Sequence, residues 1–210
     1  MAYYFMYIPI SCAIFSIIMG LVFFKTLPLS VKLLVFGAIL SITSDILAFQ
    51  THKVSTNSQI HNIYILADFY LLLFASYSLY KGKIRTVFTA CAAVAYAAVW
   101  SFFIVKNGFS QFAYMAFTFS SLLTVINYLI ILYYNEVKPN ARNLAPVRLL
   151  CFSLVVYHCG TFTIFMAIEF LMKDKIFGPI VDINTALDSL KYIGLGVAYY
   201  KFKKQGYSIE

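Results

Sequence analysis

The fold is constrained most by apolar runs that are too long and too uniform for a soluble domain. Residues 12–24, for example, read CAIFSIIMGLVFF and are apolar on every face. The chain is 62% hydrophobic and 11% charged, whereas a soluble domain is about half apolar and a quarter charged. Such a chain cannot cover a soluble core with a polar surface, so we expect the lipid bilayer to surround most of its side chains.

In a bilayer, only α-helices and closed β-barrels satisfy all backbone hydrogen-bonding groups. Barrel strands alternate between apolar and polar residues, and these runs do not. Segments of about 20 apolar residues can cross the hydrocarbon core as helices. We therefore predict an all-α, polytopic bundle of seven transmembrane helices within residues 1–204, followed by a short cytoplasmic tail at 205–210. The predicted helices span roughly 3–24, 33–50, 62–80, 86–105, 112–134, 149–172 and 178–200.

The basic residues predict the orientation, because cytoplasmic loops carry an excess of Lys and Arg. Eleven lie beside the ends of the first, third, fifth and seventh helices, and four lie on the other side. This bias places the N-terminus outside and the C-terminus in the cytoplasm. The net charge of +8 then indicates attraction to anionic membrane lipids and does not indicate nucleic-acid binding. Residues 1–24 lack a basic start and a cleavage site, so we expect the first helix to be retained.

Several ionisable residues interrupt the apolar runs. They are Asp45, Asp68, Asp182, Asp188 and Lys191, with His158 as a further titratable group. A charged side chain in the middle of a membrane helix raises the free energy of insertion by about 2.5–3.5 kcal/mol. A charge at such a position is therefore a candidate for a functional site. Asp182 lies nearest the outer surface, where water can reach it.

Helical spacing places the polar residues on common faces. Asn184, Asp188 and Lys191 are separated by four and three positions and form one stripe, and Tyr64 and Asp68 form another together with His61. In lipid, such stripes turn inward and form hydrogen bonds between helices. We therefore predict a polar cavity, open to the outer side, between the second, third, sixth and seventh helices. Its candidate ligand-binding residues are Asp45, Tyr64, Asp68, His158, Asn184, Asp188 and Lys191.

Two interpretations of these residues remain open. In the first, Asp188 and Lys191 form an ion pair and the remaining polar groups only hold the helices together. In the second, the acids serve a function, because Asp45, Asp68 and Asp188 share only one buried cation, Lys191. At least one carboxyl group is then protonated, hydrated or bound to a ligand.

Lys191, followed by YIGLGVAYYKFK, resembles the last helix of the microbial rhodopsins, and Asp68 in YILADFYLLL resembles their counterion segment. The resemblance implies retinal bound to Lys191 as a Schiff base, or an opsin-like or proton-coupled transporter using Asp68, Asp188 and Lys191. The sequence departs from that family in the spacing of Asp188 and Lys191, which is three instead of four. The sixth helix also lacks the Trp and Pro that line the retinal pocket.

An intramembrane hydrolase is a further alternative. His61, His158, Asp45 and Asp68 are residue types that can bind zinc, as in intramembrane hydrolases of lipid amides. The segment SITSDILAF around Asp45 also resembles the acid-bearing helix of the lysoplasmalogenase family. Motifs for a serine nucleophile, a P-loop or a cofactor are missing from the sequence, which favours a binding protein over an enzyme.

Five residues carry a further resemblance, namely Asp45, Asn57, Tyr64, Asp68 and Phe69. At these positions the chain resembles a group of seven-helix membrane proteins of Bacteroidetes. The resemblance implies the fold and a bacterial inner membrane, and it implies no activity. We therefore expect a sensor or receptor-like membrane protein that binds a small or lipidic ligand in the outward-facing cavity. A helix shift caused by ligand binding would be transmitted to a cytoplasmic signalling partner through the basic inner loops.

Overall fold

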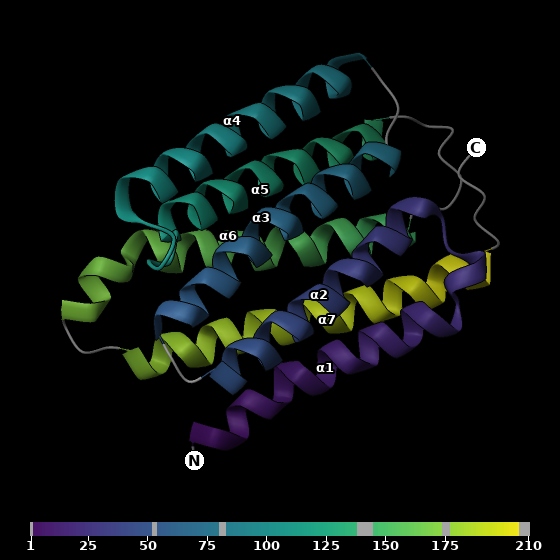
Figure 1. Cartoon of the computed structure of the whole chain (residues 1–210). Helices are drawn as coiled ribbons and strands as arrows, with labels where there is room; N and C mark the ends of the chain where they lie inside the picture. Colours follow the sequence, from purple (N-terminus) through teal and green to yellow (C-terminus); the bar gives the residue numbers. More distant parts are fainter. Residues whose placement is uncertain (1, 52–53, 80–82, 138–144, 174–176, 206–210) are drawn as a thin grey trace.

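The computed structural model describes residues 2–51, 54–79, 83–137, 145–173 and 177–205. Within these ranges the chain forms seven α-helices and one short 3₁₀ helix, η1, at Phe24–Thr26. The α-helices are α1 Ala2–Val22, α2 Leu29–Thr51, α3 Val54–Leu79, α4 Lys83–Asn107, α5 Tyr114–Val137, α6 Ala145–Lys173 and α7 Phe177–Gln205. The predicted all-α fold is confirmed (Figure 1).

Five of the helices are long and apolar enough to cross a membrane. The candidate spans are Leu29–Ala48, Thr56–Tyr77, Arg85–Asn107, Tyr114–Val137 and Ala145–Ala167. The chain therefore has the properties of a multi-pass membrane protein. α1 contributes a shorter apolar stretch, Tyr7–Val22, and the charged residues of α7 lower its hydropathy, although α7 is as long as α6.

The structure corrects the predicted start of the third helix. Residues 51–61 were expected to form a polar connector, but α2 continues to Thr51 and α3 begins at Val54. The hydroxyl group of Thr51 donates a hydrogen bond to Asn57 Oδ1, which joins the end of one helix to the start of the next. Polar residues remain helical here because the intrahelical hydrogen bonds of an α-helix do not require apolar side chains.

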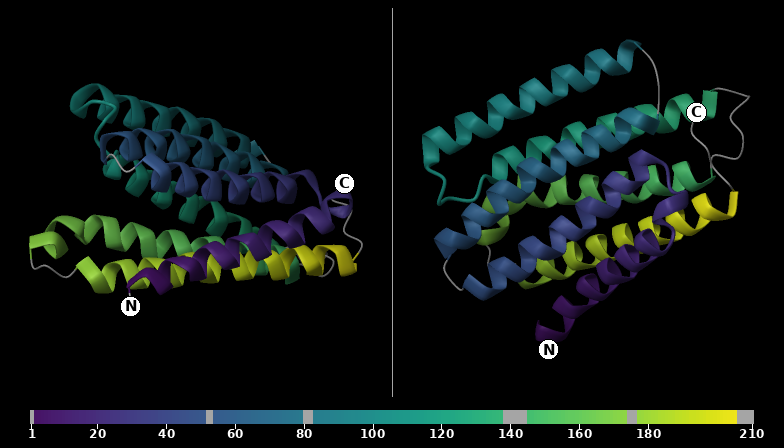
Figure 2. Two further views of the ribbon diagram at one scale, coloured as in Figure 1. Left: turned by 60° about the horizontal axis from the view of Figure 1, so that its bottom comes forward. Right: turned by 45° about the vertical axis from the view of Figure 1, so that its right-hand side comes forward.

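The helices lie in two layers (Figure 2, left). α1, α6 and α7 form one layer, α2, α3 and α4 lie in the other, and α5 contacts α3, α4 and α6. α1, α3, α5 and α7 begin at one end of the bundle, which we call the N-terminal end, and α2, α4 and α6 begin at the opposite, C-terminal end. α4 lies outermost and packs against α3 and α5.

Small residues allow α7 to approach two neighbours closely. A Cβ atom on Gly194 would overlap the side chain of Ser153 in α6, and one on Gly196 would overlap Phe15 in α1. Gly20 of α1 lies equally close to Val35 of α2. Membrane helices associate through such small-residue contacts because lipid provides little hydrophobic drive between helices.

Polar groups join α3 to α4 and α5. Asn127 Nδ2 donates to Ser76 Oγ over 2.5 Å, and the Tyr128 hydroxyl donates to a backbone carbonyl of α3 over 3.1 Å. Tyr96 in α4 donates to another α3 carbonyl over 3.2 Å. Ser120, Thr124 and Asn127 share one face of α5 and are all buried, as expected for polar side chains that turn inward in lipid.

Candidate functional site

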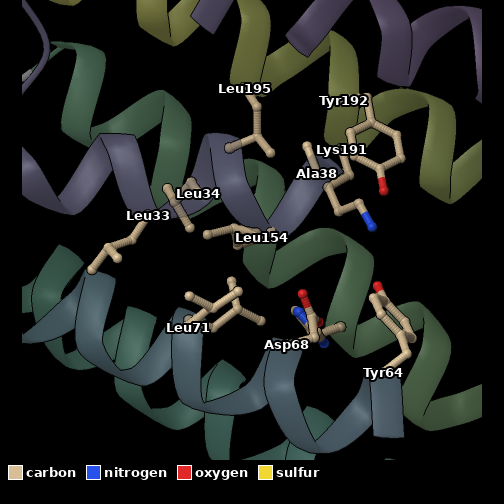
Figure 3. A pocket seen from close by; sticks show the side chains of 13 residues that line it. Leu33, Leu34, Ala38, Tyr64, Asp68, Leu71, Leu154, Lys191, Tyr192 and Leu195 are labelled. Atoms are coloured by element: carbon tan, nitrogen blue, oxygen red, sulfur yellow. The ribbon is translucent and has the colours of Figure 1, made fainter. Parts of the chain in front are cut away.

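A small cavity lies between the two layers. Its walls come from α2, α3, α6 and α7 (Figure 3). The space open to the centre of a water molecule is about 20 Å³, and one water needs about 10–15 Å³ by this measure. In this conformation the cavity therefore has room for about one or two water molecules.

The cavity is polar on one side and apolar on the other. Its polar end is formed by Tyr64, Asp68, His158 and Lys191. The apolar wall is made of leucines, namely Leu33, Leu34, Leu71, Leu72, Leu154 and Leu195. Figure 3 shows Leu33, Leu34 and Leu71 on the side of the cavity away from Tyr64 and Lys191.

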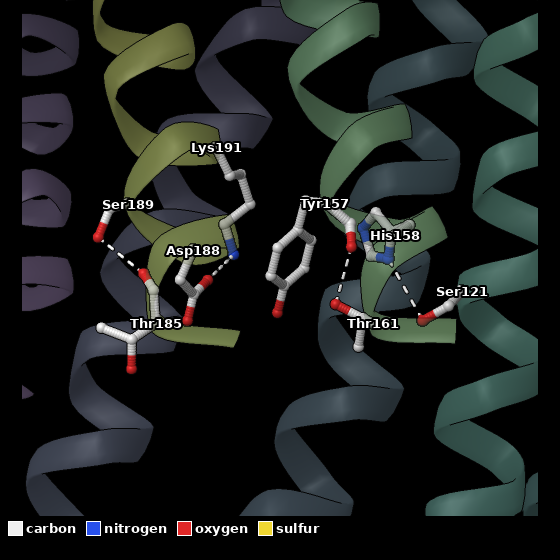
Figure 4. A network of polar contacts seen from close by, with 8 residues as sticks. All are labelled: Ser121, Tyr157, His158, Thr161, Thr185, Asp188, Ser189 and Lys191. Carbon is white, nitrogen blue, oxygen red and sulfur yellow. Dashed lines mark hydrogen bonds and ion pairs between the residues drawn. The ribbon is translucent and has the colours of Figure 1, made fainter. Parts of the chain in front are cut away.

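Lys191 is held at the polar end by an ion pair and two aromatic rings. Its ammonium nitrogen lies 2.8 Å from Asp188 Oδ1, 3.8 Å from the ring centre of Tyr157 and 4.3 Å from that of Tyr192. Figure 4 shows the pair beside the Tyr157 ring. Lys191 is 7% exposed, so these groups replace most of the water around a charge that would otherwise be costly to bury.

Asp68 differs from Asp188, because no hydrogen bond or ion pair reaches its carboxylate from any described residue. The side chain is partly buried, and it interacts electrostatically with Lys191 and with Asp188. Gly37 of α2 leaves space beside it, since a Cβ atom at Gly37 would lie 3.6 Å from Asp68 Oδ1. Asp68 is therefore a carboxylate at the cavity wall without a direct partner in the described structure.

His158 is fixed from the other side. It is 3% exposed, and its Nδ1 atom lies 3.4 Å from the Ser121 hydroxyl of α5 (Figure 4). One turn further along α6, Thr161 donates a hydrogen bond to its own helix, to the Tyr157 carbonyl, over 2.8 Å. His158 thus links the cavity to α5.

Three of the predicted site residues do not line the cavity. Asp188 lies behind Lys191 as its ion-pair partner. Asp45 is exposed and lies seven residues, or about two turns, beyond Ala38 towards the N-terminal end. Asn184 is displaced in the same direction, seven residues before Lys191. Helical spacing gives the direction of a side chain but not the height of a cavity along a helix.

The zinc ligands considered in the sequence do not come together. His61 lies next to Ser44, with 3.4 Å between its Nδ1 and the hydroxyl oxygen. Across the described ranges, no three His, Cys, Asp or Glu side chains form a group that could hold a metal ion.

Sequence reasoning missed three residues. Tyr157 and Tyr192 contact the Lys191 ammonium, but among 17 tyrosines nothing in their spacing marks them. Asn62 is fully buried and joins α3 to the segment between α4 and α5 at the N-terminal end. The sequence signal that could have identified Asn62 is its position as an amide directly before the apolar run at residues 63–66.

Comparison of the chain with protein-family models, with curated proteins and with solved structures finds no match. The geometry of the cavity is thus the basis for a functional proposal, and the resemblances noted in the sequence stay predictions.

Proposed function

We propose that the protein is a membrane sensor that binds a small ligand in the cavity between α2, α3, α6 and α7. The observation that carries the proposal is the cavity itself, which joins Tyr64, Asp68, His158 and Lys191 to a wall of leucines. Ligand sites are mostly apolar, with a few convergent polar groups that fix orientation. The cavity, with a free volume of about 20 Å³, would widen when the ligand binds.

The proposal includes seven membrane spans in a bacterial inner membrane. α1 and α7 pack along each other, α1 also packs on α2, and α7 also packs on α6, so they run beside helices that have the properties of spans. Basic residues such as Lys25, Lys32, Lys201 and Lys203 belong to the C-terminal end, which would face the cytoplasm. The N-terminal end would then face outward.

Binding would be transmitted along continuous helices. Lys191 lies in the same helix as Lys203, whose ammonium group lies 4.7 Å from the ring centre of Phe23. Lys32 of α2 contacts the Phe24 ring at 5.2 Å. A shift of α2 or α7 at the cavity would therefore move basic groups at the C-terminal end, where a signalling partner would bind.

Native mass spectrometry of the detergent-purified protein tests the proposal. We expect a bound mass on the wild type that is lost from Asp68→Asn and is kept by Asp182→Asn, which alters an exposed acid outside the cavity. The proposal would be contradicted if none of the three proteins carried a bound mass, either as purified or after incubation with membrane extract.

An opsin-like or proton-coupled transporter remains a second candidate, favoured by the buried pair of Lys191 and Asp188. It predicts a coloured product with retinal that is lost in Lys191→Met, or acidification of vesicles. In the structure the Lys191 ammonium already contacts a carboxylate and two rings, which supports the sensor over Schiff-base chemistry.

A further inference from the structure

We infer that the ligand of this cavity is a small organic cation, an ammonium group on a short apolar chain, with Asp68 as its counterion. The inference rests on the proposed function, because it assigns a chemical class to the ligand of the same site.

The charges at the polar end favour a cation. Lys191 lines the same cavity as Asp68, but its ammonium nitrogen is already 2.8 Å from Asp188. Asp68 is left with no direct partner among the described residues. A carboxylate in a low-dielectric site is stabilised by a positive charge at hydrogen-bonding distance, whereas an anionic ligand would be repelled by it.

The shape of the cavity favours a small amine. The free space of about 20 Å³ suits one or two waters, and an ammonium group is similar in size to one water molecule. The alkyl chain would occupy the wider form of the cavity that the proposed function includes. The leucine wall begins on the far side of the cavity from Tyr64 (Figure 3). An ammonium group against Asp68 would therefore direct a short alkyl chain towards Leu34 and Leu71.

Aromatic rings at the polar end strengthen the case. Tyr64 and Tyr192 both line the cavity, and the Tyr192 ring already faces one ammonium group, that of Lys191, at 4.3 Å. Ring faces attract cations. Desolvation of an incoming ammonium would thus be offset by the carboxylate and by the π faces together.

Two further acids lie on the N-terminal side of the cavity. Asp45 is exposed and Asp188 is partly exposed. Asp45 lies beyond the cavity residues of α2 in the direction of the N-terminal end, and Asp188 precedes Lys191 in α7. Negative charge near a site raises the local concentration of cations, so these acids would favour the approach of a cation to Asp68.

The test uses n-propylammonium chloride as the probe, with n-propanol and sodium propionate as neutral and anionic counterparts. Binding is measured from the thermal unfolding midpoint of the full chain in detergent over a concentration series. We expect propylammonium to raise the midpoint and the other two probes to leave it unchanged at equal ionic strength. Asp68→Asn should weaken the apparent affinity at least about tenfold, the usual effect of a hydrogen bond to a charged group, and Asp182→Asn should stay within about twofold of the wild type by the same measure.

A second variant keeps the test decisive if Asp68→Asn fails to fold. Gly37→Ala places a methyl group in ordinary contact with Asp68 Oδ1, at 3.6 Å, and so fills ligand space without a clash. It should fold and lose propylammonium binding. The inference is overturned if propylammonium does not bind, if propionate or propanol binds as well, or if both variants bind it normally. If propionate binds to the wild type and Gly37→Ala abolishes that binding, the assignment of a cationic ligand is wrong, but the proposed ligand site stands.

Discussion

Replacement of Asn62 by alanine should destabilise the N-terminal end of the bundle. The Asn62 side chain is fully buried and makes three hydrogen bonds to the segment between α4 and α5. Its Nδ2 atom donates to the carbonyls of Phe109 at 3.0 Å and Gln111 at 2.8 Å, and its Oδ1 atom accepts from the Ala113 amide at 2.8 Å.

Each hydrogen bond contributes about 1 kcal/mol to stability, so Asn62→Ala should lower the free energy of unfolding by about 3 kcal/mol. The loss is larger if the backbone groups that Asn62 contacted stay buried without partners. For a chain of this size the loss corresponds to about 6–12 °C in the unfolding midpoint. Asn62→Asp retains the acceptor but not the donor, so it should be destabilised as well. Asn107→Ala is the matched control, because among the described residues Asn107 donates only to a carbonyl of its own helix, that of Phe103.

Trp100 provides a local signal for this experiment. It is the chain's single tryptophan, and its indole nitrogen donates to the Asn62 carbonyl over 3.1 Å. Melting followed by Trp100 fluorescence reports the N-terminal end, and circular dichroism reports the whole helical bundle. If Asn62→Ala melts within about one degree of Asn107→Ala by both signals, less than one hydrogen bond's contribution, the reasoning is refuted.

Three further changes test other parts of the structure by the same melts. Asp188→Asn should cost about 3 kcal/mol because it leaves the buried Lys191 ammonium without its partner, and adding Lys191→Met should recover most of that loss. Gly194→Leu should cost at least about 1–3 kcal/mol through overlap with Ser153 in α6. Tyr96→Phe should cost about 1 kcal/mol for one lost interhelical hydrogen bond.

For each of these three substitutions, one melting result would contradict the structural explanation given for it. An Asp188→Asn protein as stable as the wild type would show that Lys191 is not held by the ion pair. Gly194→Leu should be compared with Gly37→Ala, which adds a Cβ atom in ordinary contact, and equal melts would mean that α6 and α7 are not closely packed. An unchanged Tyr96→Phe protein would remove this link between α3 and α4.

Apolar runs predicted the seven helices well because backbone hydrogen bonding in lipid leaves few alternatives. They did not predict helix ends. The polar residues from Val54 to His61 extend α3 beyond its apolar part, and hydropathy gives no information on where a polar segment remains helical. The 3.6-residue period of the α-helix places Ser120 and Asn127 on one face of α5, and both side chains are buried.

The candidate site was only partly accessible from the sequence. Charge in an apolar run marked Asp68 and Lys191, and both line the cavity. Asp45 follows the same rule but lies exposed two turns away, because a helical period gives the direction of a side chain and not its height relative to other helices. The rings of Tyr157 and Tyr192 depend on how α6 meets α7, which the sequence of either helix alone does not contain.

The central claim is that the cavity is a ligand site reached from the N-terminal end. It is tested most directly by Ala38→Cys, placed at a cavity position in a protein whose four native cysteines are replaced, and reconstituted in vesicles of known orientation. We predict that a small cationic thiol reagent labels this cysteine from the N-terminal side, that an anionic reagent of the same size labels it more slowly, and that Leu150→Cys in the closed core stays unlabelled. Protection of Ala38→Cys from both reagents, while Asp182→Cys at the exposed end reacts, would contradict the account.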